Sequence, residues 1–148
     1  NIKSHAYELE IAKLFHDVWV TGEACPMWCP LVENYEYDSH GADYFVKKSL
    51  DRLLEKDSLI DCIILGCTHY PLLLNKIQKY VPQGVRVMPQ GEYVAASLKC
   101  YLERHPDMEQ RWSTGGQVWY QTTEQADVFQ SNASVFMGQD VSAQRVNL

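Results

Sequence analysis

The sequence lacks three features that would place it in other classes of protein. No apolar run reaches the roughly 20 residues of a transmembrane helix, and no basic segment followed by an apolar one opens the chain. Basic residues do not dominate, since 13 Lys and Arg against 19 Asp and Glu give a net charge of −6, which argues against nucleic-acid or membrane partners. The five cysteines, an odd number at irregular spacing, do not suggest a disulfide framework, so we expect a cytoplasmic protein.

What the sequence has is alternation between helical and extended patterns. A chain of 148 residues with 46% hydrophobic content can bury one core. Apolar spacing predicts helices over Ser4–Phe15, Gly41–Lys56, Leu72–Val81, Glu92–Arg104 and Glu124–Met137, the last with Thr123 as N-cap. Apolar runs rich in β-branched residues predict strands at Val18–Val20, Ile60–Leu65, Val85–Met88, Val118–Thr122 and Val141–Val146, with a loop over Gly22–Pro30. This order predicts an α/β fold with a mostly parallel sheet flanked by helices.

The stretch after the most apolar predicted strand carries groups that can do chemistry. Ile60–Leu65 is followed by Cys67, Thr68 and His69, and Pro71 then begins a helical pattern. Parallel sheets present functional groups at the carboxyl ends of their strands, and a helix N-terminus favours the reactive thiolate form of cysteine. From residue types alone, a buried structural cysteine beside an incidental histidine is an equal alternative.

Three blocks of the sequence resemble glutamate racemases. Gly66–Leu73 reads Gly-Cys-Thr-His-Tyr-Pro-Leu-Leu and is similar to the second catalytic-cysteine signature of that family. Ala24–Glu33 resembles the family segment Ala-Cys-Pro-x-x-x-Pro-Leu-Val-Glu, and Ile2–Tyr7 is similar to the start of the first helix in the family's second domain. The blocks occur in the family's order and cover roughly the first 90 residues, about the size of a compact half-enzyme.

The resemblance implies a domain organisation. Members of the family have two α/β domains with the active site between them, and the chain crosses to the second domain and returns to the first. By this analogy, residues 1–88 form the second domain, incomplete at its N-terminus, and residues 89–148 return to pack on a first domain that is absent here. The returning segment is then expected to expose apolar surface.

The resemblance also implies the reaction, the cofactor-independent interconversion of L- and D-glutamate. The weakly acidic α-proton is removed on one face of Cα and replaced on the other, so two bases are needed, and a thiol with a pKa near 8.5 is suited to this role. Cys67 would be one base, and the other would lie in the absent domain, so the isolated chain is expected to be inactive. The implied product is D-glutamate for peptidoglycan, made by a cytoplasmic enzyme without cofactor or metal that is a homodimer at full length.

The same analogy assigns roles to neighbouring residues. His69 would assist the thiol and contact substrate, Thr68 would hold the substrate carboxylate, and Glu33 would tune the imidazole or the thiol. A turn-stabilising threonine and a solvated glutamate are nearly equal alternatives for the last two. Cys25 is expected to pack, and Cys29, where the family usually has an aliphatic residue, is expected to lie in the core.

Three other functions stay open at this point. An aspartate racemase or other amino-acid racemase of the family is the nearest, although aspartate racemases tend to carry Glu where His69 stands. A non-catalytic α/β binding module is the second. A zinc site is the third, formed by Cys25, Cys29, Cys67 and His69, although their spacing does not match a familiar zinc module.

The sequence departs from the family at two places. Asn1 stands where members usually have a threonine of a substrate-facing turn, and Met88–Glu92 replaces the usual Ile-Asp-Ser-Gly run at the return crossing. Cys62 and Cys100 match no family motif and are expected to be structural.

Overall fold

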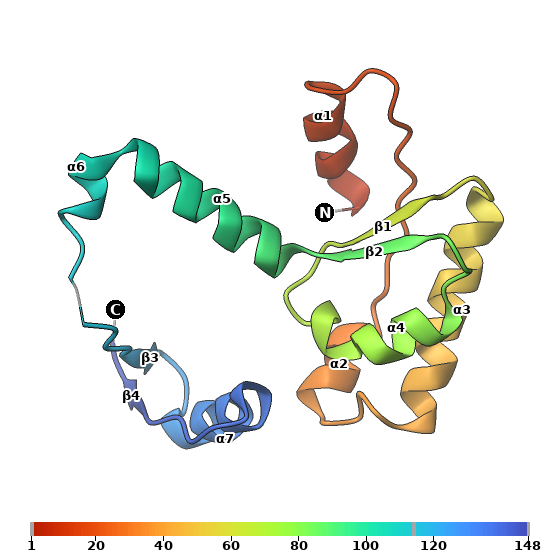
Figure 1. The fold of residues 1–148 in the computed structure, drawn as a ribbon. Coiled ribbons are helices and arrows are strands. Elements are labelled where there is room, and N and C mark those ends of the chain that lie inside the picture. Colours follow the sequence, from red (N-terminus) through yellow and green to blue (C-terminus); the bar gives the residue numbers. More distant parts are fainter. Residues whose placement is uncertain (1, 114, 148) are drawn as a thin grey trace. The chain divides into compact units, whose positions relative to one another are not determined.

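The computed structural model describes residues 2–113 and 115–147 and divides the chain into two compact units (Figure 1). The units are Asn1–Tyr93 and Val94–Leu148. Asn1 itself, one of the two departures from the family pattern, lies outside the described residues. The expected return of residues 89–148 to another domain remains a prediction.

The first unit has three α-helices in succession and then a strand, a helix and a second strand, so the predicted alternation holds only in its later part. Its elements are the 3₁₀ turn Ile2–Ser4, α1 (Ala6–Ala12), α2 (Trp28–Glu33), α3 (His40–Lys56), β1 (Cys62–Leu65), the 3₁₀ helix Tyr70–Leu73, α4 (Leu74–Tyr80) and β2 (Arg86–Pro89). Helix α5 (Gln90–Arg104) begins in the first unit and continues into the second, which contains α6 (Pro106–Glu109), β3 (Tyr120–Thr122), α7 (Ala126–Met137) and β4 (Ala143–Arg145).

Both strand pairs are parallel, which confirms the α/β fold class. In the first unit, β1 pairs with β2 in a register that sets Cys62 opposite Arg86 and Leu65 opposite Pro89. In the second unit, β3 pairs with β4 from Tyr120–Ala143 to Thr122–Arg145. Helix α4 lies between β1 and β2 in the chain, so this segment is a βαβ crossover, the connection that parallel strands require.

The core of the first unit forms where α2, α3, α4 and β1 meet. Ser39 opens α3 as N-cap, its Oγ accepting a hydrogen bond from the backbone N–H of Ala42 at 3.1 Å. The side chains buried in this core come from all four elements and from the 3₁₀ helix: Trp28, Leu31, Val32, Ala42, Val46, Leu50, Ile63, Leu65, Leu73 and Ile77. The predicted helical stripes of α3 and α4 therefore face inward. This core fixes β1 relative to α2, and both elements contribute to the site described below.

Four local predictions are wrong. Val18–Val20 is not a strand, and Trp19 there is 93% exposed, because a β-branched run needs a neighbouring strand to pair with. The predicted loop Gly22–Pro30 contains the start of α2. Helix α1 ends at Ala12, so the expected apolar stripe does not extend to its last two members, which are exposed. The residue at the N-cap of α7 is Gln125 rather than Thr123.

The second unit contains long amphipathic helices with little buried surface. Among the residues described for α5 and α7, none is buried, and Val94, Leu98 and Val128 are 61%, 45% and 50% exposed. Within the described part of the chain, no helix has the length and apolar character needed to cross a membrane.

An ionic cluster joins α3 to α4. The carboxylate of Asp43 accepts hydrogen bonds from Lys76 Nζ at 2.8 Å, Lys79 Nζ at 3.0 Å and the Tyr80 hydroxyl at 2.8 Å. These donors, Lys76 first, hold the pKa of Asp43 well below its usual range. The cluster thus connects the two helices, and the side chains of Lys76 and Asp43 within it are mostly buried.

Candidate functional site

Cys67 lies two residues beyond the carboxyl end of β1, where parallel sheets carry functional groups. The backbone N–H of Tyr70 donates to the carbonyl oxygen of Cys67 at 3.2 Å and starts the 3₁₀ helix that leads into α4. The thiol is half-buried and has polar partners within reach. Cys67 therefore differs from a cysteine packed deep in hydrocarbon.

A thiol, an imidazole and a carboxylate are aligned at this position. The sulfur of Cys67 lies 3.7 Å from His69 Nδ1, and His69 Nε2 lies 3.2 Å from Glu33 Oε1. If Nε2 carries the ring proton, it donates to the carboxylate, and the Nδ1 lone pair faces the thiol. The structure therefore brings together the three residues that the sequence analysis selected as catalytic.

A second thiol completes the cluster, at a residue that the sequence analysis placed in the core and considered as a site residue only in the zinc alternative. Cys29 Sγ lies 3.5 Å from Cys67 Sγ, and Cys29 is half-buried rather than enclosed in the core. Burial, followed by the neighbouring Cys67, raises the pKa of the Cys29 thiol to about 11. Cys29 and Glu33 are four residues apart on α2 and share one face of the helix, so this spacing was the available sequence signal.

The remaining predicted residues lie around this cluster. Thr68 is exposed next to Cys67, and its contact with a substrate carboxylate remains a prediction. Cys25 is half-buried with its sulfur 3.8 Å from the carbonyl oxygen of Glu23, and burial raises its pKa to about 11. A thiol with that pKa is protonated near neutral pH, which fits the expected packing role.

Tyr7 supports the turn that carries Cys67. Its hydroxyl accepts a hydrogen bond from Gln90 Nε2 at 2.7 Å. A Cβ atom added to Gly66 would lie 3.1 Å from the Tyr7 hydroxyl oxygen and 3.3 Å from its ring carbons. A residue larger than glycine would therefore crowd Tyr7 here, and the sequence analysis did not identify Tyr7 as a neighbour of the site.

The cluster also has the donor atoms of a metal site. One ligand atom each from Cys29, Cys67 and His69 lie within 4.8 Å of one another. Two thiols and an imidazole are ligands that suit zinc. Cys25, the fourth residue of the zinc alternative, is outside this group. The structure thus brings together three of the four residues of the zinc alternative, Cys29, Cys67 and His69.

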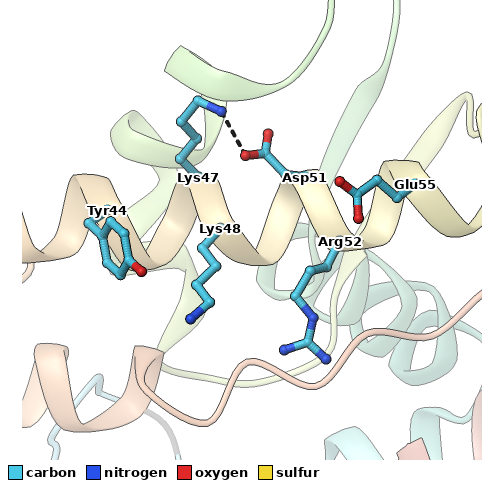
Figure 2. A pocket seen from close by; sticks show the side chains of 6 residues that line it. All are labelled: Tyr44, Lys47, Lys48, Asp51, Arg52 and Glu55. Carbon is cyan, nitrogen blue, oxygen red and sulfur yellow. Dashed lines mark hydrogen bonds and ion pairs between the residues drawn. The ribbon is translucent and has the colours of Figure 1, made fainter.

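A separate groove runs along the outer face of α3 (Figure 2). It is lined by Tyr44, Lys47, Lys48, Asp51, Arg52 and Glu55, all from one helix. Lys47 Nζ and Asp51 Oδ2, one turn apart on the helix, form an ion pair at 2.6 Å. Since none of the predicted site residues lines this groove, it is a feature of a charged helix surface and not of the thiol cluster.

Among known proteins, the chain is similar to glutamate racemases in both sequence and structure. No protein-family profile matches the chain. A glutamate racemase from Ruegeria sp. (strain TM1040) is 37% identical over 141 residues, covering 95% of this chain and 50% of the relative. The crystal structure of glutamate racemase isoform RacE1 from Bacillus anthracis matches with a TM-score of 0.85 at 30% identity, over 99% of this chain and 54% of that one.

A third match shows the fold alone. The glutamate racemase from Francisella tularensis subsp. tularensis SCHU S4, solved in complex with D-glutamate, is 22% identical with a TM-score of 0.84 and covers 99% of this chain and 54% of that one. The chain spans about half the length of the relatives that it matches.

Fold and site together define an α/β protein with a thiol–imidazole–carboxylate cluster at the end of a parallel strand. The sequence and structure comparisons make the class specific. The chain is homologous to the carboxyl-terminal half of glutamate racemases.

Proposed function

We propose that this chain supplies one half of the active site of a glutamate racemase, with Cys67 as one of its two acid–base thiols. The observation that carries the proposal is the alignment of Cys67, His69 and Glu33 at the end of β1, in a chain homologous to these enzymes. The relatives carry the name glutamate racemase, and one relative was solved with D-glutamate bound. Glutamate is therefore the proposed substrate.

The geometry gives each residue a step in proton transfer. His69 Nδ1 accepts the thiol proton of Cys67, and the resulting thiolate removes the α-proton from one enantiomer. In the reverse direction, the Cys67 thiol returns a proton to the same face of Cα. Glu33 stabilises the imidazolium that forms in between, because its carboxylate lies 3.2 Å from Nε2.

A second base is needed on the opposite face of Cα, and we place it in a first domain outside this chain. Cys29 does not take this role, because its sulfur lies only 3.5 Å from that of Cys67 and leaves no room for a substrate carbon between them. Residues 1–88 are then the second domain, and residues 89–148 cover the first domain with the apolar surface of α5 and α7. Thr68, exposed next to the thiol, binds the substrate carboxylate.

We also propose where the enzyme acts and what its product is for. The enzyme acts in the cytoplasm as a homodimer, needs no cofactor and supplies D-glutamate for peptidoglycan. The chain alone is inactive, because a single base cannot serve both faces of Cα.

The test is an assay of the protein encoded by the complete gene. Purified protein and L-glutamate are expected to give D-glutamate, followed by circular dichroism of the amino acid, with no added cofactor and full activity in a metal chelator. L-Aspartate is the matched alternative substrate, and preferential turnover of aspartate would replace the glutamate assignment. No turnover of either amino acid, in a folded protein, would support the binding-module alternative.

A further inference from the structure

We propose that Cys29 and Cys67 form a dithiol that a hydroperoxide converts reversibly to a disulfide. The proposal goes beyond racemisation, in which Cys29 has no role. The pair is specific to this chain's residues, because Cys29 stands where the resemblance leads one to expect an aliphatic side chain.

The geometry places the two sulfurs in contact without a bond. Their separation is 3.5 Å, whereas a disulfide has an S–S distance of about 2.05 Å, so each sulfur has to move by less than about 1 Å. Cys29 is on α2, and Cys67 is on the turn between β1 and the 3₁₀ helix. A turn residue can make this movement by rotating its side chain, while the helix keeps its backbone hydrogen bonds.

The surroundings distinguish the two thiols. His69 Nδ1 lies 3.7 Å from the Cys67 sulfur and can accept its proton, which favours the thiolate that attacks peroxide. The Cys29 sulfur lies 3.5 Å from the Cys67 sulfur, within reach of it once Cys67 is oxidised. Because His69 faces Cys67, we assign Cys67 as the residue that peroxide oxidises and Cys29 as the residue that resolves the product.

The steps balance with hydrogen peroxide as the oxidant. The Cys67 thiolate attacks one peroxide oxygen and the O–O bond breaks, which leaves Cys67 as a sulfenic acid. The departing hydroxide takes the proton that His69 had accepted from the thiol and becomes water. The Cys29 sulfur then attacks the Cys67 sulfur, the S–O bond breaks, and the departing hydroxide takes the Cys29 proton. Two thiols and one peroxide give one disulfide and two waters, and an added dithiol reverses the reaction by exchange.

The effect of this disulfide on activity rests on the proposed function, whereas the formation of the disulfide does not. A Cys67 sulfur bound to Cys29 cannot carry the α-proton, so peroxide is expected to stop racemisation reversibly. In a protein without Cys29, the sulfenic acid has no resolving partner and proceeds to sulfinic acid, which dithiols do not reduce. Cys29 thus protects Cys67 from irreversible oxidation.

The test maps disulfides in the protein encoded by the complete gene, with Cys100→Ser as background to remove an exposed thiol that could join two molecules. Brief treatment with hydrogen peroxide, alkylation of free thiols and proteolysis without reductant are expected to yield one peptide that joins Cys29 to Cys67. Dithiothreitol is expected to restore nearly all free thiol at both positions.

Two variants test which cysteine resolves the sulfenic acid at Cys67. Cys29→Val is expected to oxidise at Cys67 to sulfinic acid, with recovery of free thiol by dithiothreitol reduced about tenfold. Cys25→Ser is expected to leave the cross-link unchanged. A cross-link from Cys67 to Cys25, or stable sulfenic acid at Cys67 with Cys29 still free, would overturn the proposal. Because mapping does not need activity, a protein that forms the cross-link but fails to racemise glutamate would overturn only the proposed function.

Discussion

The Nε2 atom of His69 lies 3.2 Å from Oε1 of Glu33, on the opposite side of the imidazole from the Nδ1 atom that faces the Cys67 sulfur. The two residues come from different elements, Glu33 from the last turn of α2 and His69 from the turn after β1. Their contact fixes the ring orientation, so the nitrogen facing the sulfur can exchange a proton with it.

Replacing Glu33 by Gln is expected to lower kcat of the complete protein about tenfold, with a smaller change in KM. The amide oxygen can still accept from Nε2, but the negative charge that stabilises the imidazolium is lost. The loss is modest because the Glu33 side chain is 59% exposed and water screens its charge. His69→Asn is expected to cost more, roughly 10²- to 10³-fold in kcat, because the proton acceptor itself is removed.

Glu36→Gln is the matched control for Glu33. It makes the same change at an exposed residue just beyond α2, and we expect kcat within about twofold of the unmodified protein. Equal effects of the two glutamine variants would mean that Glu33 acts through net charge rather than through His69.

Gly66→Ala is expected to destabilise the protein by about 1–3 kcal/mol. The new methyl group would lie 3.1 Å from the Tyr7 hydroxyl, which is held by Gln90, so the turn or the tyrosine has to shift. Gly91→Ala is the control, since its Cβ meets nothing within 4 Å and α5 gains helix propensity. Urea unfolding measures both. A Gly66→Ala protein as stable as the control variant would show that Tyr7 does not constrain the turn.

A second variant tests whether contact with Tyr7 causes the expected loss of stability in Gly66→Ala. Tyr7→Ala removes the contact, so adding it to Gly66→Ala is expected to recover part of the lost stability in a double-mutant cycle. Strictly additive effects would rule out a direct contact between the two positions.

The Asp43 cluster makes stability depend on pH. The pKa of Asp43 is lowered in the folded protein by Lys76, Tyr80 and Lys79, whereas an unfolded Asp titrates near 3.9. The stabilisation is therefore fully present above about pH 4 and is lost as the pH falls towards the folded pKa. Asp43→Asn is expected to unfold at lower urea concentration at pH 7, and its difference from the unmodified protein is expected to shrink below about pH 4.

Asp51→Asn provides the comparison for Asp43. Asp51 pairs with Lys47 along the exposed face of α3, and such helix pairs contribute only about 0.3–0.5 kcal/mol (Figure 2). A pH-independent difference between Asp43→Asn and the unmodified protein would contradict the assignment of the cluster.

The sequence predicted α3 and the elements of the βαβ crossover well, because their signals are local. Val46 and Leu50 on α3, and Leu73 and Ile77 before and within α4, recur at helical spacing and are all buried. The strand predicted at Val18–Val20 was wrong for the opposite reason. Its β-branched residues favour a strand, but pairing depends on a neighbour that local sequence does not specify.

The site was predicted where it follows a motif and missed where it depends on contacts between elements. Cys67, His69 and Glu33 were selected from two sequence blocks, and the structure brings them together. The position of Cys29 beside Cys67 depends on how α2 packs against the turn after β1, a distance of 38 residues in sequence. Residue type alone favours burial for a cysteine, so the sequence analysis placed Cys29 in the core and set it near Cys67 only in the zinc alternative.

The most direct measurement of the central proposal is hydrogen exchange at Cα of glutamate. The complete protein, incubated in D₂O with either enantiomer, is expected to produce the opposite enantiomer carrying deuterium at Cα, detected by NMR. Cys67→Ala, with an unchanged circular dichroism spectrum, is expected to lower the rate of inversion at least about 10³-fold. Inversion with deuterium uptake at an undiminished rate in Cys67→Ala would contradict the assignment of this thiol as a base.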